Sequence, residues 1–227
     1  PSLIFQDLQK ENILSSYYES MIFKDIIERY KIEDVNKLKA LANLLFESVS
    51  REISYSKLTN KLSSIGFKTS KNTVIEYLSY FEEAYLFFQN LKYEYSLAKQ
   101  LGSIKKLYCI DNGLLNTVSF KFSDDFGKLL ENLVFIELRR RNEQVYFFKK
   151  NYECDFLIVR KNKVSLAIQV TKKLDDDNEK REINGLLEAM RKHKLNEGII
   201  LTEEAEEERN IEGKKIRIIP IWKWLLE

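Results

Sequence analysis

Three oxygen-bearing side chains stand inside apolar segments in the second half of the sequence. Glu131 lies in the stretch 126–140, whose apolar residues cover almost every side of a helix, and such a helix is buried. Asp155 opens the apolar run 156–159 and Gln169 interrupts the run 166–170, and both runs are typical of short buried strands. Because a buried polar group needs a partner, we expect helix, strand and strand each to direct one potential oxygen ligand inward.

Carboxylates that face inward can hold a hard divalent cation, which polarises a phosphoryl group and lowers the pKa of a bound water. The order of Glu131, Asp155 and the strand with Gln169 resembles the PD-(D/E)XK, or restriction-endonuclease-like, nucleases. Their pattern is a glutamate, an aspartate and a strand carrying Glu-x-Lys, and the spacing here suits the archaeal Holliday-junction resolvase branch. The resemblance implies a weakly held Mg²⁺ or Mn²⁺ with Glu131 and Asp155 as its ligands.

A wider resemblance covers residues 17 to 226. The chain is similar to the region of unknown function that follows the ATPase domain in prokaryotic AAA-type ATPases, and the segments that carry the likeness are FKDIIERY, LYCIDNGLL, LLENLVFIELRRR, ECDFLIV, AIQV and IPIWKWLL. It implies an ATPase domain upstream in the full-length chain, or a partner protein. Pro1 would then begin a fragment or a stand-alone relative, and a complete chain that has lost its initiator Met is equally compatible.

The sequence departs from the nuclease pattern at two positions. Gln169 and Thr171 stand where the pattern has the glutamate and the lysine, so one negative and one positive charge are missing. Lys172 is adjacent, but strand alternation directs it to the opposite face unless the strand ends at Thr171. Lys149 or Lys150, on the preceding strand, could take this role instead. The candidate catalytic residues are Glu131, Asp155, Gln169, Thr171 and Lys172.

Two hypotheses about function remain open. One is a metal-dependent DNA endonuclease of the Holliday-junction-resolvase-like type. The other, which the two departures favour, is a nucleic-acid-binding or partner-binding module of an AAA-type ATPase that keeps only a degenerate nuclease-like site. None of the 7 glycines opens a phosphate-binding loop with a Walker-type lysine, so we expect this chain neither to bind nor to hydrolyse ATP.

Composition limits the remaining classes. The net charge of +2 balances 37 basic against 35 acidic residues, so nucleic-acid binding must be argued from local clusters. Two cysteines are too few for a disulfide framework and fit a cytoplasmic, reducing compartment. His193 is the single histidine, and we interpret it as a solvated surface residue. No segment is apolar over the ~18 residues that a membrane span needs.

The first half is predicted to be helical. An amphipathic helix is expected at 17–30, either as a core helix or as a docking surface. Helices at 36–48, 56–65 and 70–85, followed by strand-like runs at 86–95 and 104–110, outline a winged helix-turn-helix. Ser70 is the expected N-cap of the third helix. Lys68 and Lys71 at the start of that helix, and Lys149 and Lys150 in the second half, are the candidate contacts to nucleic-acid phosphates.

The predicted fold class is α+β. We divide the chain into an N-terminal helical segment (1–34), a winged helix-turn-helix-like domain (35–112) and a nuclease-like domain (113–227), a restriction-endonuclease-like mixed sheet flanked by helices. Residues 175–178 are read as the N-cap of a helix reaching Lys192, and strands are expected at 198–201 and 215–219. We interpret the acidic run 203–208 as solvated surface, and Trp222 and Trp224 as packing residues.

Overall fold

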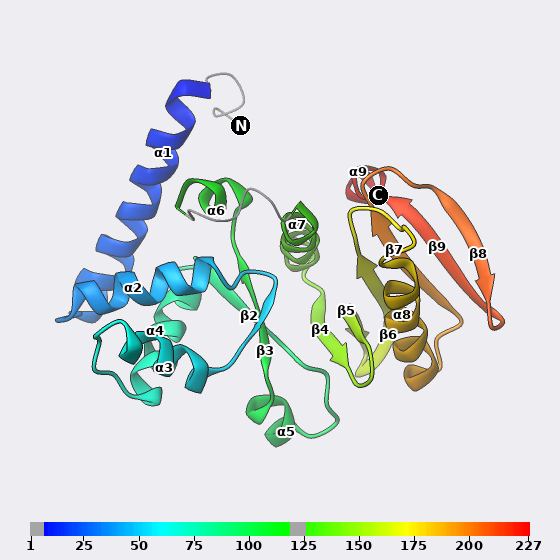
Figure 1. The fold of residues 1–227 in the computed structure, drawn as a ribbon, viewed down its shortest axis with the longest axis horizontal. Coiled ribbons are helices and arrows are strands. Elements are labelled where there is room, and N and C mark those ends of the chain that lie inside the picture. The colour runs from blue at the N-terminus through cyan, green and yellow to red at the C-terminus, as the bar shows by residue number, and fades with distance from the viewer. Residues whose placement is uncertain (1–6, 119–125) are drawn as a thin grey trace. The chain divides into compact units, whose positions relative to one another are not determined.

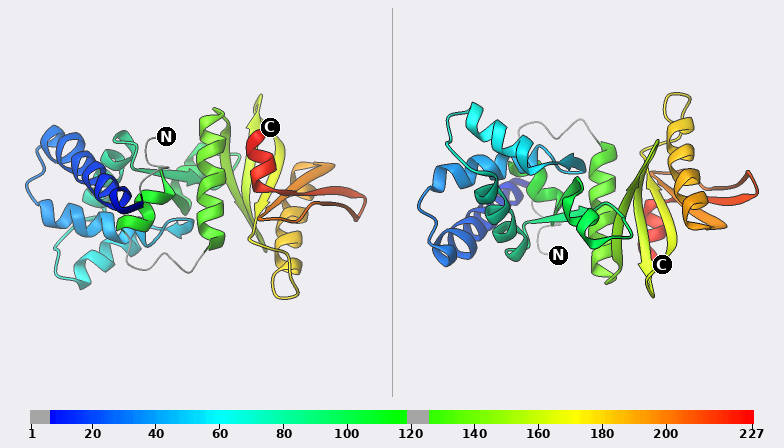
Figure 2. Two further views of the ribbon diagram at one scale, coloured as in Figure 1. Left: turned by 90° about the horizontal axis from the view of Figure 1, so that it is seen from above. Right: turned by 90° about the horizontal axis from the view of Figure 1, so that it is seen from below.

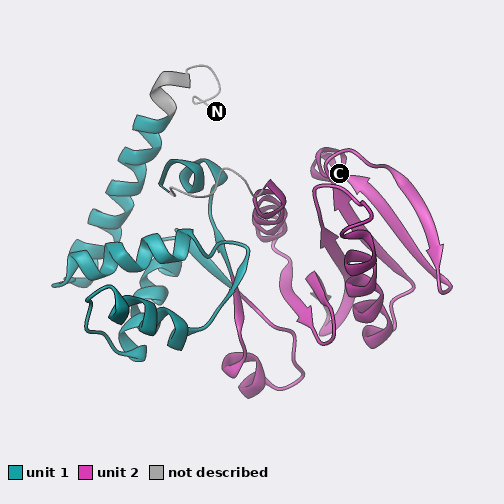
Figure 3. Cartoon of the chain, viewed as in Figure 1, with its two compact units in different colours: residues 1–89, 107–124 teal, residues 90–106, 125–227 magenta. Residues whose placement is uncertain are grey.

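The computed structural model describes residues 7–118 and 126–227 and has a mixed α+β fold (Figure 1). The chain forms two compact units (Figure 3). Unit 1 contains residues 1–89 and 107–124, and unit 2 contains residues 90–106 and 125–227. The chain therefore passes into unit 2 for a short segment and returns to unit 1 before it enters unit 2 again. Within the described residues, none of the helices has the length and apolar character that a membrane span requires.

Unit 1 is built mainly from helices. They are α1 (Asp7–Ser20), a π-helix η2 (Met21–Glu28), α2 (Val35–Phe46), α3 (Tyr55–Ser64), α4 (Lys71–Glu83) and α6 (Asn112–Val118). The three helices expected between residues 36 and 85 are confirmed as α2, α3 and α4. Ser70 is the N-cap of α4, since its Oγ accepts a hydrogen bond of 3.1 Å from Thr73 N. The helix expected at 17–30 is present as the end of α1 and the π-helix.

A three-stranded sheet with the order β1-β3-β2 accompanies these helices. Its strands are β1 (Arg51–Ile53), β2 (Phe87–Leu91) and β3 (Lys105–Cys109). Phe46 of α2, Phe81 of α4 and Phe87 of β2 meet edge to face, with ring centroids 4.7 and 5.6 Å from Phe87. The core of unit 1 lies where these aromatic side chains bring the helices onto the sheet.

Unit 2 contains a six-stranded mixed sheet with the order β4-β5-β6-β7-β9-β8. The strands are β4 (Gln144–Lys149), β5 (Glu153–Arg160), β6 (Lys163–Val170), β7 (Glu197–Thr202), β8 (Glu207–Ile211) and β9 (Lys214–Pro220). β4, β5 and β6 are antiparallel neighbours, β6, β7 and β9 are parallel, and β8 closes the edge antiparallel to β9. The helices of unit 2 are α5 (Leu97–Gly102), α7 (Phe126–Arg140), α8 (Glu179–His193) and α9 (Ile221–Leu226).

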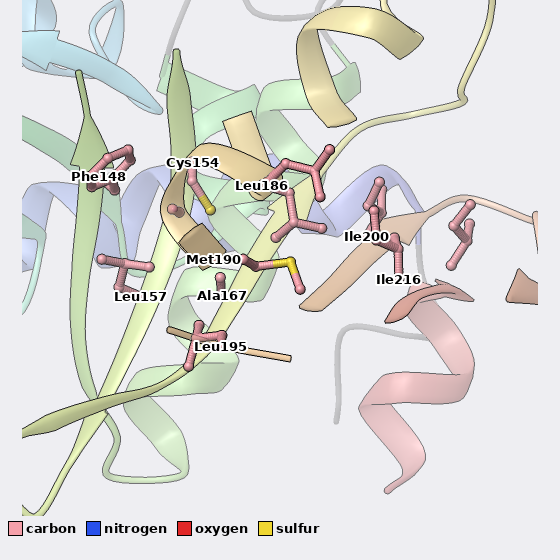
Figure 4. Close-up of a cluster of buried hydrophobic side chains, with 12 residues drawn as sticks. Phe148, Cys154, Leu157, Ala167, Leu186, Met190, Leu195, Ile200 and Ile216 are labelled. Atoms are coloured by element: carbon pink, nitrogen blue, oxygen red, sulfur yellow. The ribbon is translucent and has the colours of Figure 1, made fainter. Parts of the chain in front are cut away.

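The helices α7 and α8 cover opposite faces of this sheet (Figure 2). Leu157 of β5 belongs to a buried cluster with Leu186 and Met190 of α8 (Figure 4). The adjacent residue, Phe156, is directed to the other face and lies 6.2 Å from the ring of Phe135 in α7. Because successive side chains of a strand point to opposite faces, β5 is buried on both sides, which explains its continuous apolar run. α8 also makes the crossover that the parallel pair β6 and β7 requires.

Two local expectations, for Trp222 and His193, need correction, and one strand was missed. The strand β8 was not predicted, because it begins at Glu207 inside the acidic run and buries little of its length. Trp224 is buried as expected, but the Trp222 side chain is 59% exposed. Asn178 is the N-cap residue of α8, as expected, although its side chain makes no cap bond; its Oδ1 accepts from Asp175 N instead. His193 is only half-exposed, since it packs on Tyr93 and Phe148.

Candidate functional site: a carboxylate cluster closed by a lysine

One ammonium group lies among three carboxylates in unit 2. Lys106 Nζ is 2.9 Å from Glu131 Oε1, 2.6 Å from Glu153 Oε1 and 2.8 Å from Asp155 Oδ1. The Lys106 side chain is 3% exposed, and those of Glu131 and Asp155 are 11% and 7% exposed. We call these four residues the carboxylate cluster. An ammonium group has three N–H donors, so one lysine can bind all three acids at once.

Three elements supply the carboxylate cluster. Glu131 lies in the second turn of α7, and Lys106 is the second residue of β3. Glu153 and Asp155 are the first and third residues of β5, and residues two apart on a strand share a face. The helix and the strand carry apolar residues around these positions, so folding buries the acids whether or not they are paired. Lys106 supplies a positive charge that offsets part of the free-energy cost of burying these carboxylates.

Both oxygens of Asp155 have partners. Oδ1 accepts from Lys106, and Oδ2 accepts a hydrogen bond of 3.0 Å from the backbone N–H of Val170 on the neighbouring strand β6. The two carboxylate oxygens of Glu153 also have different partners. Oε1 contacts Lys106 Nζ, and Oε2 lies 3.2 Å from Lys149 Nζ. Burial opposes the ionisation of Glu153, but the two lysines outweigh burial and hold the pKa of Glu153 below its ordinary value.

Gln169 connects the carboxylate cluster to α8. Its Oε1 accepts a hydrogen bond of 3.3 Å from Asp155 N, and its Nε2 donates to Glu182 of α8, which also accepts from Arg181. Burial, reinforced by the nearby charge of Asp155 and opposed by these hydrogen bonds, raises the pKa of Glu182 above its ordinary value. An amide fits this position because it accepts from one neighbour and donates to the other.

A glycine lets α8 approach β5 at this point. A Cβ atom placed on Gly185 would lie 2.0 Å from the backbone oxygen of Glu153 and 3.7 Å from Gln169 Oε1. No side chain fits there, because the first obstacle is a backbone atom. Gly185 therefore allows the helix that carries Glu182 to pack directly over the start of β5, where two of the three acids lie.

The other candidate catalytic residues lie away from the ammonium group. Thr171 donates a hydrogen bond of 3.0 Å to the carbonyl oxygen of Lys173 and accepts one from Asn178, so it organises the turn before α8. Lys172 Nζ lies 5.2 Å from the ring centroid of Phe126. The structure thus brings Glu131 and Asp155 together at Lys106, with Gln169 bonded to Asp155 N, while Thr171 contacts the turn before α8 and Lys172 contacts Phe126.

The candidate phosphate contacts lie in different units. Lys68 and Lys71 are exposed on unit 1, before and at the first residue of α4. In unit 2, Lys149 ends β4 and pairs with Glu153, while Lys150 is exposed in the following turn. Lys149 is one of the two substitute lysines that the sequence suggested, and its Nζ lies 3.2 Å from Glu153 Oε2.

The carboxylate cluster does not fit a divalent cation as it stands. A cation would need carboxylate oxygens at about 2.0–2.1 Å for Mg²⁺, and the position that the three acids share is taken by Lys106 Nζ. The fourth polar side chain, Gln169, uses its oxygen to accept from Asp155 N. Throughout residues 7–118 and 126–227, no group of three or more His, Cys, Asp or Glu side chains has an arrangement that could hold a metal ion.

Sequence reasoning missed Lys106, Glu153 and Glu182. A signal for the first was present, since Lys105 and Lys106 interrupt the apolar run 104–110 just as Gln169 interrupts its own strand. Both lysines are buried, with 7% and 2% exposure. Glu153 and Glu182 carried no comparable signal, because each has polar neighbours in the sequence. Glu153 reaches the carboxylate cluster through its contact with Lys106 of β3, and Glu182 is connected to it by the packing of α8 on β5.

The fold and the site define a class of protein, a two-unit α+β chain whose second unit contains a cluster of three carboxylates around one buried lysine. The chain belongs to the family described as "Domain of unknown function (DUF8612)", whose model matches residues 1–125. Residues 126–224 match "Domain of unknown function (DUF4143)". The boundary between the two matches falls at the start of α7, the helix that carries Glu131.

Curated relatives share almost the whole chain. An uncharacterized protein of Methanocaldococcus jannaschii is 38% identical over 236 residues, which cover 99% of this chain and 52% of the relative. An uncharacterized protein of Haemophilus influenzae is 32% identical over 229 residues, covering 100% of this chain and 55% of the relative. The chain therefore spans about half the length of the curated relatives it matches. No solved structure matches it significantly.

Proposed function

We propose that this chain is a non-catalytic nucleic-acid-binding module of a longer protein, with a restriction-endonuclease-like second unit whose cation position is filled by Lys106. The observation that carries the proposal is the approach of one ammonium nitrogen to within 2.9 Å of three carboxylate oxygens. A lysine offsets part of the charge of the acids, but it offers no open coordination position at which a water can be ionised for attack on a phosphodiester.

The arrangement of unit 2 supports the nuclease-like interpretation of the fold. A helix with Glu131 is followed by antiparallel strands with Asp155 and Gln169, and a crossover helix then leads to parallel strands. The order of Glu131, Asp155 and Gln169 in the chain and their proximity in the fold agree with the sequence resemblance. Fold does not imply activity, so whether the chain cleaves nucleic acid depends on the residues at the site.

We also propose, from the sequence resemblance, that this module follows an ATPase domain of the AAA type. The curated relatives are about twice as long as the part that this chain matches, which leaves room for such a domain. The helices α2, α3 and α4 followed by β2 and β3 are the elements that a winged helix-turn-helix needs. Lys68 and Lys71 at the start of α4 are exposed for phosphate contact.

The same observation favours a second candidate, the active nuclease. Lys106 contacts Glu131 and Asp155, so it could replace the missing lysine at position 171 by approaching from another element. Lys106 would then stabilise the charge that develops on the phosphate, which for one stabilising contact is typically worth about 10² to 10³ in rate. This candidate requires Lys106 to leave at least one carboxylate so that a cation can enter.

A cleavage assay separates the two candidates. Supercoiled plasmid and four-way-junction DNA are incubated with Mg²⁺ or Mn²⁺ and the wild type, Asp155→Ala, Lys106→Met, or the double change Gln169→Glu with Thr171→Lys. We expect no nicking by the wild type with Mg²⁺ and at most a trace with Mn²⁺. Robust wild-type cleavage that both Asp155→Ala and Lys106→Met abolish would overturn the proposal and establish the second candidate.

A further inference from the structure

Unit 2 contains a second polar site, a pocket of about 180 Å³ beside the end of β4 and the C-terminal end of α8. It is formed by the segment after β2, by the last residues of β4 and by the last two residues of α8. We call it the Tyr95 pocket. Its lining residues are Lys92, Tyr93, Glu94, Tyr95, Phe148, Lys149, Lys150, Lys192 and His193.

The charge of the Tyr95 pocket is positive. Four lysines and one glutamate line it, and that glutamate, Glu94, is already paired with Lys92 at 3.0 Å. Lys149 is paired with Glu153 of the carboxylate cluster. Lys150 and Lys192 make no ion pair with any residue that the structure describes, so their charges are available to an anionic ligand. Clustered lysines of this kind are what phosphate neutralisation requires.

An exposed aromatic ring accompanies the lysines. The Tyr95 side chain is 77% exposed, although it packs edge to face on Tyr93 with ring centroids 5.7 Å apart. Lys192 Nζ lies 5.9 Å from the Tyr95 ring centroid. Tyr93 in turn packs on His193 at 5.0 Å and on Tyr146 at 5.5 Å, so the ring of Tyr95 is supported from below by a fixed aromatic group. A supported ring with a free surface is a stacking platform.

One lining residue has an unsatisfied polar atom. His193 Nε2 is buried and has no hydrogen-bond partner among the residues that the structure describes. This nitrogen is closed to solvent, so its missing partner is a cost of packing the His193 ring on Tyr93 and Phe148 and is not itself a ligand contact.

We infer that the Tyr95 pocket binds single-stranded nucleic acid, with one base stacked on Tyr95 and the adjacent phosphates neutralised by Lys150 and Lys192. The pocket is smaller than the roughly 300–1,000 Å³ of small-molecule sites, and it suits one nucleotide of a longer chain. A duplex offers no free base face to Tyr95, because its bases are stacked on each other. The inference rests on the proposed function in that it assigns the kind of nucleic acid that the module binds.

Fluorescence anisotropy with labelled oligo(dT) and oligo(U) of about 12 nucleotides tests this inference, and the two oligonucleotides distinguish DNA from RNA. We expect Tyr95→Ala to weaken binding about tenfold or more, since one stacked base typically contributes that much. Charge reversal of Lys150 and Lys192 to Glu should weaken binding further. It should also reduce the slope of log affinity against log salt by about 1.4, or about 0.7 for each phosphate that is no longer neutralised.

Two matched variants control for general effects. Trp222→Ala removes another exposed aromatic side chain of unit 2, and Lys163→Glu with Lys180→Glu reverses two exposed lysines that do not line the pocket. Both should bind like the wild type. Every substituted position is on the surface, so circular dichroism and the unfolding midpoint should be unchanged in all four variants.

Three results would overturn the inference: no binding of either oligonucleotide, equal affinity for a duplex of the same length, or binding that the Tyr95 and lysine variants leave unchanged. Failure of the proposed function is recognised separately. Metal-dependent cleavage by the wild type would contradict the non-catalytic assignment while leaving the Tyr95 pocket intact. Binding that depends on Lys68 and Lys71 alone would keep the module's nucleic-acid role and reject the Tyr95 pocket.

Discussion

Lys106 Nζ lies 2.8 Å from Asp155 Oδ1, although 49 residues separate the two in the chain. Lys106 ends the segment 90–106, which belongs to unit 2 although the residues before and after it belong to unit 1. The buried ion pair between Lys106 and Asp155 therefore links residues 90–106 to β5 in the sheet of unit 2. Breaking such a pair is costly because it leaves a charge buried without a counter-ion.

Lys106→Met should destabilise the protein by about 3 to 5 kcal/mol, because three carboxylates would lose their shared partner. Urea unfolding measures the change. Lys105→Met is the matched control: Lys105 is also buried in β3, but its Nζ donates at 2.9 Å to the carbonyl oxygens of Leu101 and Ser103. The control should lose only about 1 to 3 kcal/mol. Equal losses would show that the cluster has no special energetic role.

Much of the fold follows from patterns that are local in the sequence. Helices α2, α3 and α4 were predictable because apolar residues repeat at helical spacing and Ser70 supplies a cap. The strands β5 and β6 were predictable from their apolar runs. β8 was not, because an edge strand of charged residues has no apolar pattern to reveal it.

The site was predictable only in part, because only residues that interrupt a local apolar pattern can be recognised from the sequence. Glu131, Asp155 and Gln169 stand out because each interrupts an apolar segment. Lys106 offered a similar signal in β3, but its partner could not be identified without the tertiary fold. Thr171 and Lys172 were placed by analogy with a family pattern. Their actual contacts depend on the turn before α8, whose conformation the sequence does not specify.

Gly185→Ala should destabilise the protein, although alanine is the better helix former by about 1 kcal/mol. The new Cβ would lie 2.0 Å from the backbone oxygen of Glu153, so α8 must move away from β5 at a cost of about 1 to 3 kcal/mol net. Gly102→Ala in α5 is the control, because a Cβ there meets nothing within 4 Å. Thermal unfolding should show opposite signs for the two variants, and a stabilised Gly185→Ala protein would refute the close approach.

Gln169→Glu should lower stability at neutral pH, because a second carboxylate would then face Glu182, whose pKa burial already raises. A raised folded-state pKa means that the folded protein binds more protons, so the deficit should shrink as pH falls toward about 4.3, the ordinary pKa of Glu. Unfolding at several pH values tests this. Gln144→Glu, at an exposed position of β4, should show no such trend. A pH-independent deficit would contradict the arrangement.

His193 should make the protein sensitive to mild acid. Burial, with a smaller contribution from Lys192, lowers the pKa of His193. The stability that its neutral form contributes is present above about pH 6.5, the unfolded value, and is lost as pH falls through the lower folded value. His193→Phe keeps the packing on Tyr93 and Phe148 and removes the titration. The loss of stability between neutral and mildly acidic pH should therefore be smaller in the variant, and an equal loss would assign it to other groups.

Titration calorimetry of the wild-type chain with Mn²⁺ tests most directly whether Lys106 fills the cation position. The account predicts no saturable binding to the wild type, and no difference between the wild type and Asp155→Asn. Lys106→Met, examined at a temperature where it remains folded, should gain a Mn²⁺ site, because the three carboxylates then lack a cation. Stoichiometric Mn²⁺ binding by the wild type that Asp155→Asn abolishes would contradict the account.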